Sequence, residues 1–84
     1  MKHAGPKALD QIEPLLAKLR KLSGLKEKTR GVFYRGSAAF LHFHEDPAGM
    51  FADLKISEEF ERLPVNTRAE IATLLSRAAN AVKR

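Results

Sequence analysis

Apolar and polar residues alternate only in the middle of the chain, from Gly31 to Ile56. A period of two is typical of strands with one buried face. Five of the six aromatic residues and two of the three histidines fall in this stretch. The pattern predicts a three-stranded antiparallel meander, around which the flanking segments pack.

Before the meander, apolar residues recur every three or four positions, which is the spacing of one face of a helix. Pro14 interrupts this pattern, because proline is tolerated in the first turn of a helix but breaks or kinks a helix interior. Residues 6–22 are therefore predicted either as two helices that break near Glu13 or as one kinked helix. The apolar positions are Leu9, Ile12, Leu15, Leu16, Leu19 and Leu22.

A helix is also predicted after the meander, beginning at Thr67. Thr67 and Glu70 have the spacing of a capping box, in which each side chain binds a backbone amide at the start of the helix. Helical spacing continues beyond this point. The apolar positions of the predicted helix are Ile71, Leu74, Leu75, Ala78 and Val82.

Residues 57–66 allow two interpretations. The run Ser57-Glu58-Glu59 suits the start of a helix, and Phe60 and Leu63 would then lie on one helical turn. The alternative is a short edge strand through Phe60 and Arg62. Whether this segment covers the second face of the meander stays open.

The predicted fold class is α+β, with the order α-β-β-β-α. A three-stranded antiparallel β-meander carries the N- and C-terminal helices on one face. Residues 1–84 are predicted to form a single domain, in which residues 1–5 have no periodicity and are expected to be disordered.

The first hairpin is predicted to turn at residues 35–38, because Gly36 suits the first central position of a type II′ turn. This register pairs Tyr34 with Ala39, Phe33 with Phe40, and Val32 with Leu41. It leaves two faces of different character. The predicted core face holds Val32, Tyr34, Ala39, Leu41, Phe43, Ala52, Leu54 and Ile56, and the second face holds Phe33, Arg35, Phe40, His42, His44, Phe51, Asp53 and Lys55.

The second hairpin is predicted at residues 46–49, where Asp, Pro and Gly occupy the positions favoured in a type I turn. A four-residue loop pairs Phe43 with Ala52, Leu41 with Leu54, and His42 with Asp53. A three-residue loop with a glycine bulge would shift the register by one residue.

Composition excludes several classes of site. The chain has no cysteine, so disulfides, thiolate metal sites and cysteine nucleophiles are ruled out. No apolar run approaches the length of a membrane span, and the expected location is cytoplasmic. Basic residues concentrate in the first 35 positions, with nine lysines and arginines against three acidic residues. Such a surface favours polyanionic partners.

The run His42-Phe43-His44 is the sharpest candidate for chemistry. On a strand the two histidines point the same way and can share a metal ion, with Asp53 as a third ligand. The motif is short and no fourth ligand follows at a fixed offset. Half-buried histidines packed on Phe40 and Phe51 are the favoured interpretation, and we expect neither a metal nor a cofactor.

Acid–base catalysis by His42 and Asp53 lacks an adjacent nucleophile, and the chain has no glycine-rich phosphate loop before a helix. No small-molecule substrate can be identified. We therefore expect a protein that is not an enzyme.

Two kinds of partner remain. Phe33, Phe40 and Phe51 on a sheet face would form an apolar patch of a size that monomers rarely expose, so we expect a small non-catalytic module that self-associates through a face of Phe33, Phe40, His42, His44 and Phe51. The alternative is single-stranded nucleic acid, whose bases stack on sheet aromatics while cations contact phosphates. The cations for that alternative are Lys26, Lys28, Arg30 and Arg35.

The stretch FLHFHEDPAGMFADLK, together with LKEKTRGVFYRGSAA before it and FERLPVNTRAE after it, resembles a family of small bacterial proteins. The resemblance implies a self-contained bacterial cytoplasmic domain. The resemblance implies no particular activity and assigns no functional residues.

Overall fold

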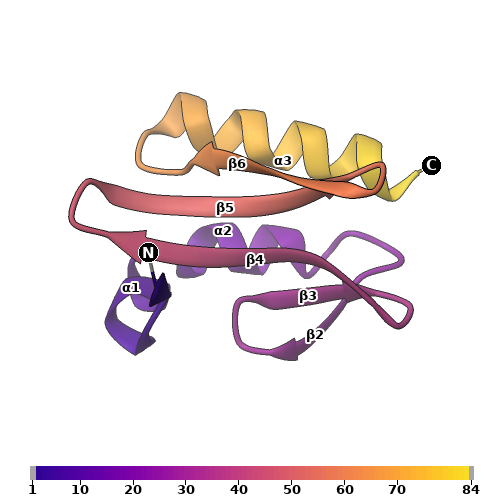
Figure 1. Cartoon of the computed structure of the whole chain (residues 1–84), viewed down its shortest axis with the longest axis horizontal. Helices are drawn as coiled ribbons and strands as arrows, with labels where there is room; N and C mark the ends of the chain where they lie inside the picture. Colours follow the sequence, from indigo (N-terminus) through magenta and orange to yellow (C-terminus); the bar gives the residue numbers. More distant parts are fainter. Residues whose placement is uncertain (1, 84) are drawn as a thin grey trace.

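The computed structural model describes residues 2–83 and combines one antiparallel sheet with three helices (Figure 1). A mixed α+β architecture is therefore confirmed, but the strand count and the order of elements differ from the prediction. In chain order the elements are β1 (Lys2–His3), α1 (Pro6–Gln11), α2 (Glu13–Leu19), β2 (Lys26–Thr29), β3 (Val32–Arg35), β4 (Ala38–Asp46), β5 (Gly49–Ile56), β6 (Glu59–Pro64) and α3 (Arg68–Val82).

Within residues 2–83 the sheet has six strands, where three were predicted. Strands β2 to β6 are neighbours in sequence order, and β1 pairs with β4. The charged run Lys26–Thr29, which precedes the predicted meander, forms β2 and pairs with the aromatic strand β3. Strand β4 is nine residues long and β3 only four, so the far half of β4 has a free edge to which β1 adds.

The chain start, in which the sequence shows no periodicity, forms the short strand β1 against β4. Lys2 pairs with Glu45 and His3 with His44 across the β1–β4 ladder. The Ala4 amide then donates to the Phe43 carbonyl at 3.1 Å. Met1 lies outside the described residues.

The first helical segment forms two helices, which confirms one of the two predicted alternatives. Ile12 ends α1 and precedes α2, and Pro14 lies in the first turn of α2, where its missing N–H costs no hydrogen bond. The last helix begins as predicted. The Thr67 side chain accepts from the Glu70 amide, and the Glu70 carboxylate accepts from the Thr67 amide.

A bulge in β4 changes which side chains the first hairpin buries. Tyr34 pairs with Ala39 as predicted, but Phe33 pairs with Leu41, which leaves Phe40 as an extra residue. An inserted residue reverses the alternation of faces beyond it. Phe33 and Phe40 consequently lie in the core, with only 1% and 3% of their surfaces exposed. The predicted Phe33–Phe40 pairing was wrong.

The second hairpin keeps the predicted register. Leu41 pairs with Leu54, His42 with Asp53, and Phe43 with Ala52. Gly49 has a φ of +134°, and a Cβ there would lie 2.6 Å from Oδ1 of Asn66. Asn66 approaches this closely because its amide bonds both the N–H and the C=O of Met50.

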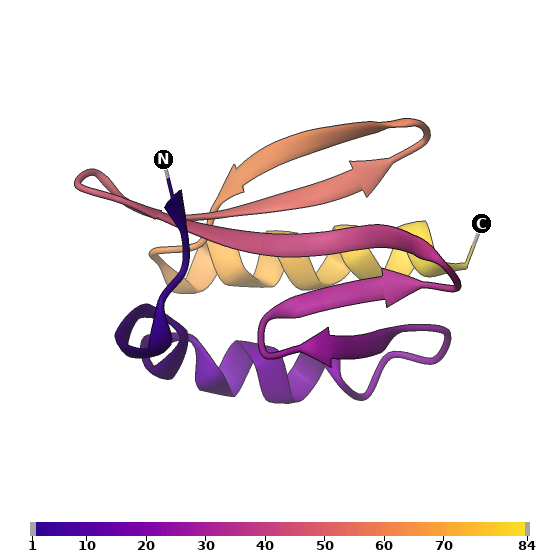
Figure 2. The same ribbon diagram turned by 60° about the horizontal axis from the view of Figure 1, so that its bottom comes forward.

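Residues 59–64 form the edge strand β6 and not a helical turn. Ile56 pairs with Glu59 across a two-residue turn, in which Ser57 has a φ of +60°. Of the two interpretations of this segment, the edge strand through Phe60 and Arg62 holds, and the helix start at Ser57 to Glu59 does not. Because β6 extends the sheet beside β5, it does not cover the second face (Figure 2).

All three helices pack on one side of the sheet, which we call the covered face (Figure 2). The leucines of α1 and α2 meet the aliphatic face of α3 and the inward side chains of β3, β4 and β5. None of the helices in residues 2–83 has the length and apolarity needed to cross a membrane. The buried core comprises Leu9, Ile12, Leu15, Leu16, Leu19, Phe33, Phe40, Leu41, Phe43, Met50, Ala52, Leu54, Val65, Leu74, Ala78 and Ala81.

Candidate functional site

The opposite side of the sheet, which we call the open face, carries the titratable side chains of the central strands. Side chains alternate along a strand, and Leu41, Phe43, Ala52 and Leu54 are buried in the core beneath the helices. The residues between them therefore point the other way. From β4, β5 and β6 the open face receives His42, His44, Phe51, Asp53, Lys55, Phe60 and Arg62.

Three histidines converge at the end of this face where β1 joins β4. The ring centroids of His3 and His44 are 4.7 Å apart, and those of His42 and His44 are 5.0 Å apart. One nitrogen from each of the three rings can be chosen so that all lie within 4.8 Å of one another. Nδ1 of His42 lies 3.0 Å from Nε2 of His44.

A buried carboxylate supports this cluster from β5. Asp53 is 7% exposed and accepts two hydrogen bonds from Arg62 on β6, at 2.7 and 2.8 Å. Its Oδ2 also lies 3.1 Å from Nε2 of His44. The hydrogen bonds from Arg62 lower the pKa of Asp53 although burial opposes them, so this carboxyl group is ionised at neutral pH.

The two strand histidines are only partly accessible to solvent. Burial lowers the pKa of His42, and the nearby charge of Asp53 acts in the opposite direction without cancelling this effect. His42 is therefore a neutral imidazole at neutral pH, with a lone pair on one nitrogen. Its ring packs on Phe60 at a centroid distance of 5.0 Å.

One atom of the cluster has no partner. Nδ1 of His44 is buried and makes no hydrogen bond within the described chain. Buried polar atoms of this kind are rare, because leaving one unsatisfied costs about 1–3 kcal/mol. Imidazole nitrogens that converge with lone pairs available can hold a transition-metal ion.

The structure changes the predicted interaction face. His42, His44 and Phe51 lie on the open face as expected, whereas Phe33 and Phe40 are buried beneath the helices and contribute nothing to an exposed patch. The β4 bulge is the physical cause. Val32, Tyr34 and Ala39, predicted to lie in the core, are only half-buried.

His3 is the member of the cluster that sequence reasoning missed. It lies in a two-residue strand that carries no hydrophobic pattern, and it meets His44 only through a pairing between residues 41 positions apart. Asp53 was considered as the third metal ligand, but both of its oxygens are engaged by Arg62. The sequence offers one weak signal for His3. It is the third histidine of the chain, and the other two lie two residues apart on one strand.

The four predicted phosphate-binding cations do not form one surface. Arg30 makes ion pairs with Asp10 and Glu13, both at 2.8 Å. Arg35 donates to the Ala81 carbonyl at 3.0 Å. Lys26 and Lys28 lie on the edge strand β2, where Nζ of Lys28 is 4.3 Å from the centre of the Tyr34 ring. With Phe33 and Phe40 buried, two of the three aromatics expected to stack on bases are inaccessible.

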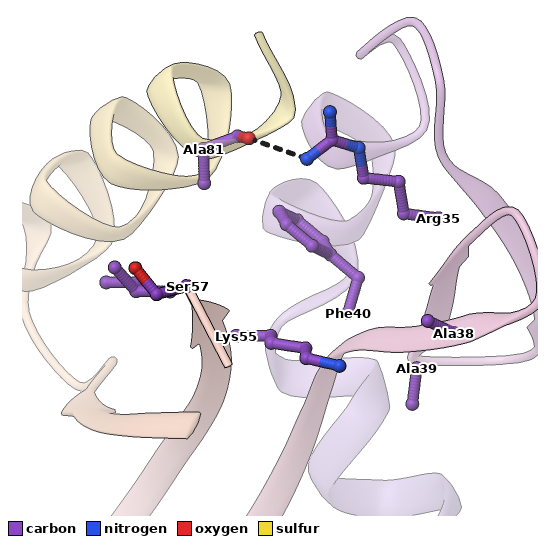
Figure 3. A pocket seen from close by; sticks show the side chains of 8 residues that line it. Arg35, Ala38, Ala39, Phe40, Lys55, Ser57 and Ala81 are labelled. Atoms are coloured by element: carbon purple, nitrogen blue, oxygen red, sulfur yellow. Dashed lines mark hydrogen bonds between the residues drawn. The ribbon is translucent and has the colours of Figure 1, made fainter. Parts of the chain in front are cut away.

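A separate cavity of about 380 Å³ lies where the C-terminal end of α3 approaches the β3–β4 turn (Figure 3). Phe40, Ala38, Ala39 and Ala81 give it an apolar lining, with Arg35 and Lys55 among the residues around it. It contains none of the histidines. The bulge that buries Phe40 thus also shapes this cavity.

Comparison of the chain with family models, with curated proteins and with solved structures found no match.

Proposed function

We propose that this protein is a small non-catalytic binding module that self-associates through the β6 side of its open face. The observation that carries the proposal is the position of Phe60. Among residues 2–83 it is the only large apolar side chain counted as exposed, at 44%, and it lies on a strand that forms one edge of the sheet (Figure 1). Unpaired edge strands are templates for pairing with a second chain.

The two edges of the sheet differ in how well they are protected. The β2 edge carries Lys26 and Lys28, and an irregular register interrupts its pairing with β3. Both features discourage pairing with another strand. On β6, Arg62 is bound to Asp53 and Glu61 to Arg77 of α3. These charges are neutralised within the chain, so β6 is the less protected edge.

The register of β6 indicates how two copies would pair. Glu59 closes the hairpin with Ile56. Because successive residues direct their N–H and C=O groups to opposite edges of a strand, those of Phe60 and Arg62 point away from β5. Antiparallel pairing of two β6 strands about Glu61 places Phe60 of each copy opposite Arg62 of the other. Ring and guanidinium attract each other in that arrangement.

The test is the mass of the protein in solution by light scattering. We expect the wild type to reach twice the 9.4-kDa chain mass as concentration rises. Phe60→Asp should stay folded and monomeric, because it replaces the exposed ring of the new contact with a charged carboxylate. Thr29→Asp introduces the same charge on the β2 edge and should leave the wild-type mass unchanged. A wild type that stays monomeric at millimolar concentration would overturn the proposal.

A further inference from the structure

We propose that His3, His42 and His44 together bind one divalent transition-metal ion of the zinc type. This site lies on the same open face but does not depend on self-association, because all three ligands come from one chain.

The distances are close to those that a metal requires. In a tetrahedral site with Zn–N bonds of about 2.0–2.1 Å, ligand nitrogens lie about 3.4 Å apart. The pair formed by His42 Nδ1 and His44 Nε2 is at 3.0 Å, and the widest separation in the chosen set is within 4.8 Å. The first distance is shorter than a zinc site requires and the second is longer, so the rings must shift slightly on binding, chiefly the exposed His3.

The donor atoms determine the class of metal. Three imidazole nitrogens suit zinc, nickel, copper or cobalt, whereas calcium and magnesium require oxygen ligands. Three protein ligands leave one tetrahedral position for water or an exchangeable ligand. The chain has no cysteine that would make a softer site.

Asp53 lies beside the nitrogen of His44 that would bind the metal. Its carboxylate is 3.1 Å from Nε2 of His44, and Arg62 holds it from the other side. A negative charge this close to the donor nitrogens favours a bound cation. The positive charge of Arg62 is offset by Asp53, and Lys2 pairs with Glu45 at 3.4 Å. Both basic groups beside the cluster are therefore neutralised, which limits their repulsion of a bound cation.

Packing of three aromatic rings is the simpler explanation of the cluster, with a proton on one of the two nitrogens that lie 3.0 Å apart. A metal ion bound by both lone pairs takes the place of that proton. Zinc binding distinguishes the two explanations.

Zinc is the probe of choice for the test. In a chain that begins at Met1 with a free amino group, a histidine in third position binds copper and nickel through the amino group and backbone amides. Those metals would therefore report His3 alone. The protein should be the full chain without a polyhistidine tag, titrated at pH 7.5 by calorimetry and by NMR of the histidine rings.

We expect one zinc per chain, with ring resonances of all three histidines shifting at stoichiometric metal. His44→Ala and His3→Ala should each weaken binding at least tenfold. His3 is exposed and lies in a two-residue strand, so His3→Ala tests the site even if His44→Ala fails to fold. Thr29→Asp, on the β2 edge of the sheet, should retain full affinity and controls for an added surface charge.

The absence of ring shifts at stoichiometric zinc would overturn the proposal. So would a folded His3→Ala that binds zinc as tightly as the wild type. A wild type that is monomeric and still binds zinc would remove the self-association proposal alone.

Discussion

The two faces of the sheet are built by the same strands, but different interactions stabilise their side chains. On the covered face, Phe33, Leu41 and Leu54 are sealed beneath the helices, and their stabilisation comes from removing apolar surface from water. On the open face, His44, Asp53 and Arg62 are linked by hydrogen bonds and ion pairs at the margin of solvent. Side chains packed on the covered face tolerate little change in shape. Polar side chains on the open face can exchange hydrogen bonds with one another for contacts with a ligand.

One inserted residue determines how the aromatics divide between these faces. Without the bulge at Phe40, Phe33 would face outward beside His42, and the open face would be strongly apolar. With the bulge, the helices bury two phenylalanines, and Phe51 and Phe60 are the ones left on the open side. The open face therefore has a smaller apolar area than it would have without the bulge, and polar side chains make up more of it.

The largest expected difference between the two faces is in the stability lost when a phenylalanine is removed. Phe33→Ala should lower the free energy of unfolding by about 3–5 kcal/mol, because it removes a ring from a packed core and leaves a cavity. Phe51→Ala, on the open face, should cost about 1 kcal/mol or less. Urea unfolding monitored by circular dichroism measures both. Similar losses for the two variants would contradict the assignment of faces.

An intermediate effect is expected at the buried carboxylate of the open face. Asp53→Asn keeps the shape of the side chain but removes the charge that Arg62 and His44 contact, and should cost about 1–3 kcal/mol. Glu61→Gln, which loses an exposed ion pair with Arg77, is the matched control and should cost under about 1 kcal/mol. Chemical denaturation of both variants at pH 7 and low salt makes the comparison. Equal costs would mean that burial does not strengthen the Asp53 contacts.

The smallest effect concerns the rim of the covered face, where Glu13 at the start of α2 binds Arg20 and Arg30. Their hydrogen bonds, that of Arg20 first, lower the pKa of Glu13 from 4.5 to about 2. A lowered pKa means that the stabilisation is present above pH 4.5 and is lost as the pH falls toward 2. Glu13→Gln should therefore lose less stability than the wild type between pH 4.5 and pH 2.

Urea midpoints at pH 7 and pH 3 measure this difference in slope. Glu58→Gln, in the turn between β5 and β6, removes a carboxylate outside the network and should leave the acid dependence of the wild type unchanged. If Glu13→Gln follows the wild-type curve, the ion pairs around Glu13 do not contribute to stability.

Local patterns located the helices and the second hairpin. Thr67 and Glu70 marked the start of α3. Pro14 indicated a break near Glu13 or a kink, and the turn at residues 46–49 allowed two registers. The structure has the break and the register that pairs His42 with Asp53. Each of these depends on interactions among residues close in sequence. The candidate site was predicted only in part, because two of its histidines share a strand and the third does not.

The sequence by itself therefore determined the helical stripes, the turn chemistry, the lack of thiol chemistry and the proximity of His42 to His44. Tertiary structure alone decided the β4 bulge, the pairing of β1 with β4 that brings His3 to the cluster, and the burial of Phe33 and Phe40. The reason is physical. Propensity and periodicity act within a few residues, whereas register and face depend on how distant segments together bury the most apolar surface.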